Sequence, residues 1–227
     1  MKRKQFGVIG LGRFGSAIAT TLAELGHDVI GVDGDEERVH QLADVIEHAI
    51  QLDATDERAL RAAGIQEVDT AVVSIGENIE SSLLVVMLLR ELGIGNIVAK
   101  AVTPLHGRIL QKLGVSRVIF PEREIAIRLA HSLVIPNVID YIELSRDFSI
   151  IEIPAPEAFI GRTLKQLELR PRYGLTLIAV KRRAGPADPA VVTNIAPPAD
   201  ETILAGDVLA LLGSNERLAQ LDRLLGR

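Results

Sequence analysis

The glycine-rich run from residue 10 to residue 15 is the feature that most constrains how this chain can fold. It has the pattern G-x-G-x-x-G and stands between a β-type segment, 6–10, and a helix-type segment, 14–25. There the first glycine permits a tight turn, the second lets the backbone approach a phosphate, and the third lets the helix pack on the sheet. The helix N-terminus adds N–H groups and a partial positive charge. The run predicts a nucleotide-binding unit, formed by Gly10, Leu11, Gly12, Arg13, Phe14 and Gly15.

The alternation of β-type and helix-type segments continues through the first 140 residues. Further short apolar and β-branched runs occur at 29–32, 49–52, 71–74, 97–101 and 118–120, and each precedes a helix-like stretch. Six such repeats predict an α/β fold with a Rossmann-like, doubly wound parallel sheet and right-handed crossovers.

A second, smaller domain is expected, because 227 residues exceed one typical domain. A proline and an asparagine at 136–137 break the chain, so we expect a nucleotide-binding domain over 1–143 and an α+β domain over 144–227. Its expected strands and helices lie at 150–153, 164–167, 175–180, 208–212 and from about 215. The run Ala184–Pro189 between two of these strands predicts a mobile or turn-rich loop.

Asp33 is the expected ribose ligand. It ends the second strand, eighteen residues after Gly15, where a carboxylate can accept hydrogen bonds from both ribose hydroxyls. An unphosphorylated ribose is therefore favoured. Arg13 stands at the tip of the glycine loop and can meet phosphates of its own ligand or of a neighbouring subunit's ligand. The alternatives are a chance cluster of turn glycines, a surface aspartate and a solvated arginine.

The third strand is followed by a run that can receive adenine, since adenine rests at the carboxyl end of this strand in doubly wound sheets. The run consists of Asp53, Ala54 and Thr55. Alternatively, Thr55 caps the helix that begins at residue 56 or 57, because a threonine hydroxyl can accept from the first backbone N–H groups. Both interpretations can hold together.

Further candidates lie at later strand ends. Ser74 and Gly76 follow the fourth strand and Lys100 ends the fifth, either as ligand contacts or as ordinary turn and surface residues. Glu122 follows Pro121 after the sixth strand. Its carboxylate would need a bridging cation such as Mg²⁺ or Ca²⁺ to meet phosphates, because two negative groups repel each other. A glutamate at a helix start also suits the helix dipole alone.

Several classes of protein fit the composition poorly. The chain has no cysteine, so disulfides, thiolate metal sites and cysteine nucleophiles are excluded. The apolar run Leu83–Leu89 is the longest and falls far short of the ~20 residues that span a bilayer, and no signal-peptide pattern opens the sequence, so a cytoplasmic location is expected. The net charge of −5 and the lack of a helix-turn-helix pattern disfavour a nucleic-acid partner.

We expect the chain to bind a nucleotide without catalysing a reaction. The main alternative is an NAD-dependent oxidoreductase, because the glycine loop and Asp33 suit NAD equally well. The second domain, however, contains no histidine and only two lysines, Lys165 and Lys181, to serve as proton donors. ATP hydrolysis is disfavoured because the chain lacks the G-x-x-x-x-G-K-[ST] loop.

The sequence resembles a known family over nearly its whole length. The matching segments are 6–15, Val32-Asp33, 53–55, Pro121-Glu122 and 172–176. They resemble KtrA/TrkA-type regulatory subunits of bacterial potassium-uptake systems, which consist of an RCK N-domain (TrkA-N) and a smaller RCK C-domain (TrkA-C). The G-L-G-R-F-G form is more specific than the general fingerprint.

The resemblance implies that ATP or ADP binds, with Asp33 at the ribose, Arg13 at a phosphate and Glu122 at a divalent cation. It further implies an octameric ring of homodimers beneath a membrane potassium-translocating subunit of the KtrB/TrkH type, at the inner face of the plasma membrane. ATP and ADP would switch the ring conformation. Cyclic di-AMP can bind across a C-domain dimer interface in this family, and the proline-containing loop 184–189 departs from relatives near that region. The corresponding positions here are approximately Leu177, Ile178, Ala179, Asn194 and Pro198.

The helix expected from Glu122 carries an apolar face formed by Ile125, Leu129 and Leu133. The small second domain offers little mass to cover this face, and an exposed apolar face favours a partner. We therefore expect a homo-oligomer larger than a dimer.

Overall fold

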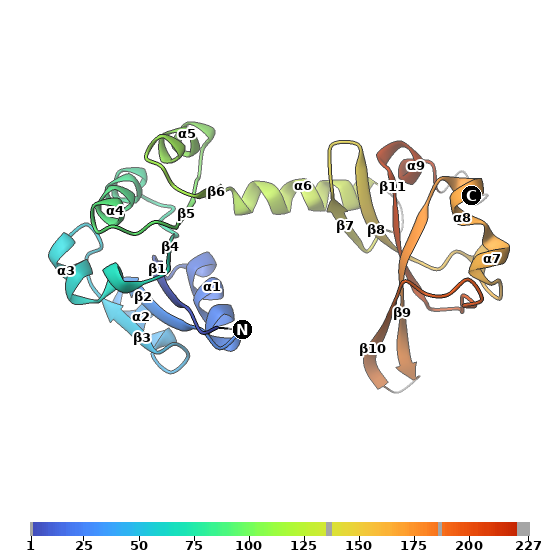
Figure 1. Ribbon diagram of the computed structural model, residues 1–227, viewed down its shortest axis with the longest axis horizontal. Helices are drawn as coiled ribbons and strands as arrows, with labels where there is room; N and C mark the ends of the chain where they lie inside the picture. The colour runs from blue at the N-terminus through green and yellow to red at the C-terminus, as the bar shows by residue number, and fades with distance from the viewer. Residues whose placement is uncertain (1, 135–137, 186–187, 222–227) are drawn as a thin grey trace. The chain divides into compact units, whose positions relative to one another are not determined.

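The computed structural model describes residues 2–134, 138–185 and 188–221, and the chain divides into two compact units (Figure 1). The first unit ends at Pro121 and the second begins at Glu122. No helix of the described residues is long and apolar enough to cross a membrane.

The first unit contains a six-stranded parallel sheet in the order β3-β2-β1-β4-β5-β6, which confirms the predicted doubly wound sheet. The order reverses between β1 and β4, and ligands of such sheets bind at this switch point. The strands are β1 (Gln5–Ile9), β2 (Asp28–Asp33), β3 (His48–Gln51), β4 (Thr70–Val73), β5 (Ile97–Lys100) and β6 (Arg117–Ile119).

Helices connect these strands, and side chains fix where four of them begin. Asp35, Asp56, Asn78 and Thr103 each accept a hydrogen bond from a first-turn backbone N–H of the helix that follows. The elements are α1 (Arg13–Glu24), α2 (Glu36–Leu42), α3 (Glu57–Ala62), the short η1 (Ile65–Glu67), α4 (Ile79–Glu91) and α5 (Pro104–Lys112).

Apolar side chains cover both faces of the parallel sheet. On β1, Val8 packs in a cluster that includes Ala19 of α1 and Leu42 of α2, whereas the next residue, Ile9, packs in a cluster that includes Leu60 of α3. This follows because successive side chains of a strand point to opposite faces. Each fully buried aliphatic side chain contributes about 1.5–3 kcal/mol, so the sheet is held firmly between its two helical layers.

The second unit contains an antiparallel sheet in the order β10-β9-β11-β8-β7, packed over a core that includes Ile151, Phe159 and Leu209. The elements are α6 (Pro121–Val134), β7 (Asp140–Glu143), β8 (Phe148–Pro154), η2 (Glu157–Phe159), α7 (Leu164–Leu167), α8 (Leu169–Tyr173), β9 (Thr176–Gly185), β10 (Asp188–Ile195), β11 (Val208–Ser214) and α9 (Asn215–Ala219). The predicted domain boundary after residue 143 would leave β7 in the first domain. β7, however, pairs with β8 of the second sheet. The contacts thus favour a division at Pro121.

The prediction of a loop over 184–189 is wrong for the residues of this range that the structure describes, because they belong to two strands. β9 extends to Gly185, and β10, which the sequence analysis missed, begins at Asp188. Pro189 is tolerated here because β10 lies at the sheet edge, where a missing N–H need not break a ladder. The residues between the strands, 186–187, and the break expected at 136–137 lie outside the described residues.

An ion-pair cluster links β9 to the loop before β11. Arg182 donates from Nε and Nη2 to the two carboxylate oxygens of Asp207, both at 2.7 Å. Its Nη2 also donates to Glu201 at 3.1 Å, and the backbone N–H of Leu204 donates to Asp207 at 2.9 Å. The Asp207 side chain is 1% exposed, so this bidentate pair ties down buried charge inside the second unit.

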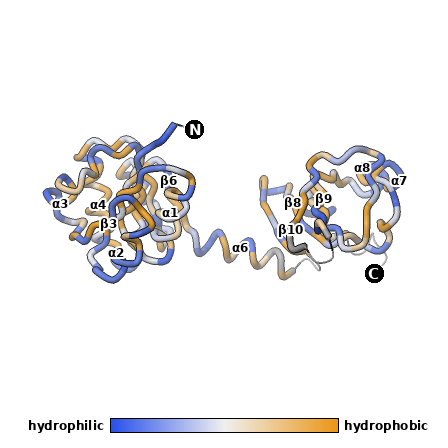
Figure 2. The backbone as a smooth tube through the Cα atoms, turned by 90° about the horizontal axis from the view of Figure 1, so that it is seen from below, coloured by the Kyte–Doolittle hydropathy of each residue, from blue (hydrophilic) through white to orange (hydrophobic). Residues whose placement is uncertain are grey.

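The predicted apolar face of α6 is present. Ile125, Leu129 and Leu133 are 59%, 56% and 77% exposed and lie four residues apart on the helix. Figure 2 shows hydrophilic and hydrophobic stretches alternating along α6. The face is therefore available to another surface.

Candidate functional site

The glycine loop packs directly on the end of β4. Gly10 has a φ of +94°, which favours glycine, and a Cβ there would lie 3.1–3.3 Å from the backbone of Ser74 and Ile75. A Cβ on Gly15 would clash with the carbonyl oxygen of Gly10. Ser74 in turn donates its backbone N–H to Ile9 at 2.7 Å. Close packing thus requires glycine at positions 10 and 15. Ser74 packs against the loop and hydrogen-bonds to the strand that precedes it.

Gly12 leaves room for a ligand. It is the N-cap residue of α1, no side chain caps the helix, and a Cβ on Gly12 would meet only Arg38 Nη1, at 3.9 Å. The first turn of α1 contains no acidic residue, and Arg13, its first residue, is exposed. The open helix start can therefore receive an anion such as a phosphate.

Asp33 is fixed at the end of β2 by two backbone hydrogen bonds. Its Oδ2 accepts from the N–H of Leu11 at 2.7 Å, and its Oδ1 accepts from the N–H of Asp35 at 2.9 Å. The side chain is only 11% exposed. A carboxylate has about four lone-pair sites, so Asp33 can hold the glycine loop and still accept from ribose hydroxyls.

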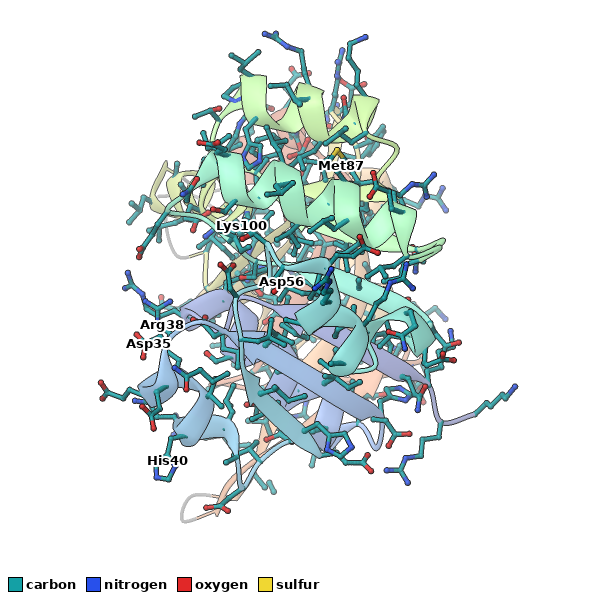
Figure 3. The ribbon with its side chains drawn as sticks, turned by 90° about the vertical axis from the view of Figure 1, so that its left-hand side faces the viewer. Asp35, Arg38, His40, Asp56, Met87 and Lys100 are labelled. Atoms are coloured by element: carbon teal, nitrogen blue, oxygen red, sulfur yellow. The ribbon has the colours of Figure 1, made fainter. Side chains whose placement is uncertain are left out.

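Arg38 is a member of this site that the sequence analysis missed. Its Nη1 lies 3.6 Å from Asp33 Oδ2, and its Nε lies 3.5 Å from Asp35 Oδ2. Figure 3 labels Asp35 and Arg38 beside one another at the start of α2. The sequence signal for it is the Asp35-x-x-Arg38 spacing, which puts a cation on the first turn of the helix that follows Asp33.

In the run after β3, the side chain of one residue hydrogen-bonds to the side chain and the backbone of another. Asp53 Oδ1 accepts from the Thr55 N–H at 2.9 Å and from Thr55 Oγ1 at 2.7 Å, and these bonds lower the pKa of Asp53. The alternative that Thr55 caps the next helix is wrong, because Asp56 accepts from the first-turn N–H groups. The backbone N–H of Leu52 donates to the Asp33 carbonyl at 3.1 Å, so this run begins beside Asp33.

Two more predicted residues, Gly76 after β4 and Lys100 at the end of β5, come together near Phe14 of α1. Lys100 Nζ lies 5.9 Å from the ring centroid of Phe14, within cation–π range. A Cβ on Gly76 would lie 3.4 Å from the same Nζ. Lys100, labelled in Figure 3, therefore brings a positive charge against the first turn of α1.

Glu122 is placed differently from the other candidates. It is the second residue of α6, is exposed, and falls in the second unit. β6 lies three strands from β1, about 14 Å at the usual strand spacing. Among the described residues no group of three or more acidic or histidine side chains is arranged to hold a metal ion. A cation role for Glu122 stays a prediction.

Comparison with known proteins identifies the family. The TrkA-N domain matches residues 6–121 and the TrkA-C domain matches residues 148–226. The chain is 39% identical over 221 residues to Ktr system potassium uptake protein C of Bacillus subtilis, covering 97% of each chain. The chain belongs to the KtrA/TrkA-type family of bacterial potassium-uptake proteins. Ktr system potassium uptake protein A of the same organism is 36% identical over 98% of this chain and 97% of its own.

The fold of the first unit also occurs among solved structures. The TrkA-N domain of the inner membrane protein ybaL from Escherichia coli matches with a TM-score of 0.51 and 20% identity, over 58% of this chain and 96% of that domain. The TrkA-N match ends at Pro121, where the contacts also divide this KtrA/TrkA-type chain. Both domains of the family are therefore present in one chain.

Proposed function

We propose that this chain is the cytoplasmic regulatory subunit of a potassium-uptake system and binds ATP or ADP at the glycine loop without catalysing a reaction. The observation that carries the proposal is the geometry of Asp33, locked to Leu11 of the loop beside an uncapped helix start. Membership of a potassium-uptake family supplies the context for that site.

Each part of an adenine nucleotide has a complementary group in this arrangement. The ribose hydroxyls donate to the remaining acceptor sites of Asp33, and the first phosphate lies over Gly12 at the start of α1. Adenine lies toward Asp53, beyond β3. NAD shares the adenosine diphosphate half, so it is the second ligand that the site suits.

Arg13 is the proposed sensor of the terminal phosphate. It is exposed at the first position of α1, where its guanidinium can extend to phosphates of its own ligand or of a neighbouring subunit's ligand. ATP offers more charge there than ADP, and such a difference in contacts lets a ligand shift a conformational equilibrium. With Mg²⁺ or Ca²⁺ at Glu122, the nucleotide would set the conformation of an octameric ring on a KtrB/TrkH-type subunit at the inner face of the plasma membrane.

Cyclic di-AMP is a further proposed ligand of the second unit. The positions named by the resemblance lie on β9, on β10 and just after β10. Asn194 donates to Glu201 at 3.2 Å, so part of its polar capacity is used within the chain. Exposed Val191, Val192 and Ile195 on the same edge strand are consistent with a dimer surface there.

Titration calorimetry with ATP, ADP, NAD and cyclic di-AMP, combined with light scattering, tests these proposals together. We expect micromolar or tighter binding of ATP and ADP, and a particle mass above that of a dimer. A monomeric particle mass at micromolar protein concentration would contradict the proposed ring. Turnover at the nicotinamide absorbance band with candidate substrates would favour the alternative, an NAD-dependent oxidoreductase.

A further inference from the structure

His106 is a buried imidazole to which the proposed function gives no role. It lies in the first turn of α5 and is only 1% exposed. Its backbone N–H donates to the hydroxyl of Thr103, the N-cap residue of this helix, at 3.1 Å. Its ring nitrogen Nε2 has no hydrogen-bond partner among the residues that the structure describes. A titratable ring therefore lies in the core with one of its two nitrogens unpaired there.

The other ring nitrogen supports the β5–α5 turn, residues 101–103. Nδ1 of His106 accepts a hydrogen bond from the backbone N–H of Val102 at 3.4 Å. A ring nitrogen that accepts carries no proton, so the proton of the neutral ring is on Nε2. The neutral ring thus holds the backbone two residues after Lys100.

The β5–α5 turn packs against the candidate nucleotide site. A Cβ on Gly76 would lie 3.7 Å from Val102 Cγ1 and 3.4 Å from Lys100 Nζ. Lys100 Nζ lies 5.9 Å from the ring centroid of Phe14, which is in the first turn of α1. His106 is therefore linked through Val102 to the lysine that lies against the start of α1.

A second proton on the ring would break this support. Both nitrogens of an imidazolium are donors, so Nδ1–H would point at the N–H of Val102. The new charge would also be buried, and the described residues offer no acceptor at Nε2. Burial accordingly holds the pKa of His106 below its usual 6.5. The ring is therefore neutral at neutral pH and takes up a proton only as the pH falls below 6.5.

The charged residues around α5 do not offset this cost. α5 packs on α4 and β6, follows β5, and is preceded by the turn that contacts the loop before α4. The charged residues of these segments and of α5 itself are Glu77, Glu80, Arg90, Glu91, Lys100, Arg108, Lys112 and Arg117. All of them except the half-buried Lys100 are exposed, and burial alone lowers the pKa of His106.

We propose that His106 is a proton sensor that couples the nucleotide site to pH. The neutral ring holds the β5–α5 turn in the position that nucleotide binding requires, and protonation releases the turn and weakens binding. Such coupling is reciprocal, so a bound nucleotide disfavours protonation of His106. The inference rests on the proposed binding of adenine nucleotides at the glycine loop.

Hydrogen exchange at the C2 position of histidine, followed by mass spectrometry, tests the reciprocal effect in the unmodified chain. It reports the titration of each histidine separately, and it is run across pH with and without saturating ADP. We expect His106 to titrate below pH 6.5, and ADP to lower its midpoint by about half a pH unit or more. The negative charge of ADP would by itself raise this midpoint, so a downward shift is not a simple charge effect. An unchanged or raised midpoint would overturn the proposal.

His106→Asn tests the effect on binding, because its amide oxygen can accept from Val102 as Nδ1 does but does not titrate. ADP is titrated calorimetrically into the wild type, His106→Asn and His40→Asn, whose replaced histidine is exposed on α2. Between about pH 7.5 and about pH 5.5 we expect the wild type and His40→Asn to lose at least about threefold more affinity than His106→Asn. The protonation of ADP itself is common to all three proteins and cancels. Equal losses in the three proteins would refute the role of His106.

The proposed function and this inference fail in different ways. If the wild type binds no ADP at about pH 7.5, the proposed function fails. If it binds ADP and the pH dependence is the same in all three proteins, only the role of His106 is overturned. Should His106→Asn prove unfolded in a thermal-unfolding control, the exchange measurement on the wild type decides by itself.

Discussion

Replacing Asp33 by alanine should weaken the binding of ADP by at least tenfold while the chain remains folded. In the proposed site the carboxylate would accept charge-assisted hydrogen bonds from the ribose, and bonds to charged groups contribute about 1.5–3 kcal/mol each. One such bond is worth about tenfold or more in affinity, since 1.4 kcal/mol corresponds to a factor of ten. The measurement is a calorimetric titration of ADP into the wild type and the variant.

The same replacement releases the N–H groups of Leu11 and Asp35, which now donate to Asp33 at 2.7 and 2.9 Å. Water can reach these groups once the side chain is gone, so we expect a loss of only about 1–3 kcal/mol in the free energy of unfolding. Asp44→Ala is a matched control, because Asp44 is exposed in the segment after α2. Unchanged ADP affinity in a folded Asp33→Ala variant would place the nucleotide elsewhere.

Three further outcomes follow from particular residues. Gly15→Ala should destabilise the chain by about 1–3 kcal/mol in chemical denaturation, because its Cβ would clash with a loop carbonyl, whereas Gly12→Ala should unfold normally yet bind nucleotide more weakly in a titration. Arg13→Ala should narrow the ratio of ATP to ADP affinity in a titration and leave ADP binding largely intact; an unchanged ratio would remove Arg13 as a sensor. Burial raises the pKa of Asp207, but its hydrogen bonds, chiefly from Arg182, outweigh this and hold the pKa below the usual 3.8. The stability that these hydrogen bonds contribute is therefore present above pH 3.8 and is lost as the pH falls through the folded-state pKa of Asp207. Circular dichroism during an acid titration should show this loss of stability in the wild type but not in Asp207→Asn.

The parallel sheet and its glycine loop could be predicted from sequence because their signals are local. Strand β1 combines apolar residues buried on both faces with a glycine pattern that only a tight turn explains. β10 was missed because its pairing with β9 defines it, and a proline near its start suggested a loop. The pairing of residues from the two strands is a long-range property that no short window of sequence contains.

The sequence predicts where the glycine loop and the strand ends of the candidate site lie, but not which side chains contact one another there. Asp33 was predicted as a ligand from its distance along the chain from the glycine loop, and its hydrogen bond to Leu11 and the approach of Arg38 depend on how β1, β2 and α2 pack together. The choice between Thr55 and Asp56 as helix cap likewise depended on backbone geometry, since both residue types cap well.

Small-angle scattering of the purified protein with saturating ATP and with saturating ADP tests most directly the claim that the nucleotide switches this subunit. The account predicts two different scattering curves at an unchanged particle mass, because in the proposed site Arg13 would meet a charge in ATP that ADP lacks. Superimposable curves, with both nucleotides shown to be bound by calorimetry, would mean that the site holds a nucleotide without sensing its terminal phosphate, and would contradict the proposed switch.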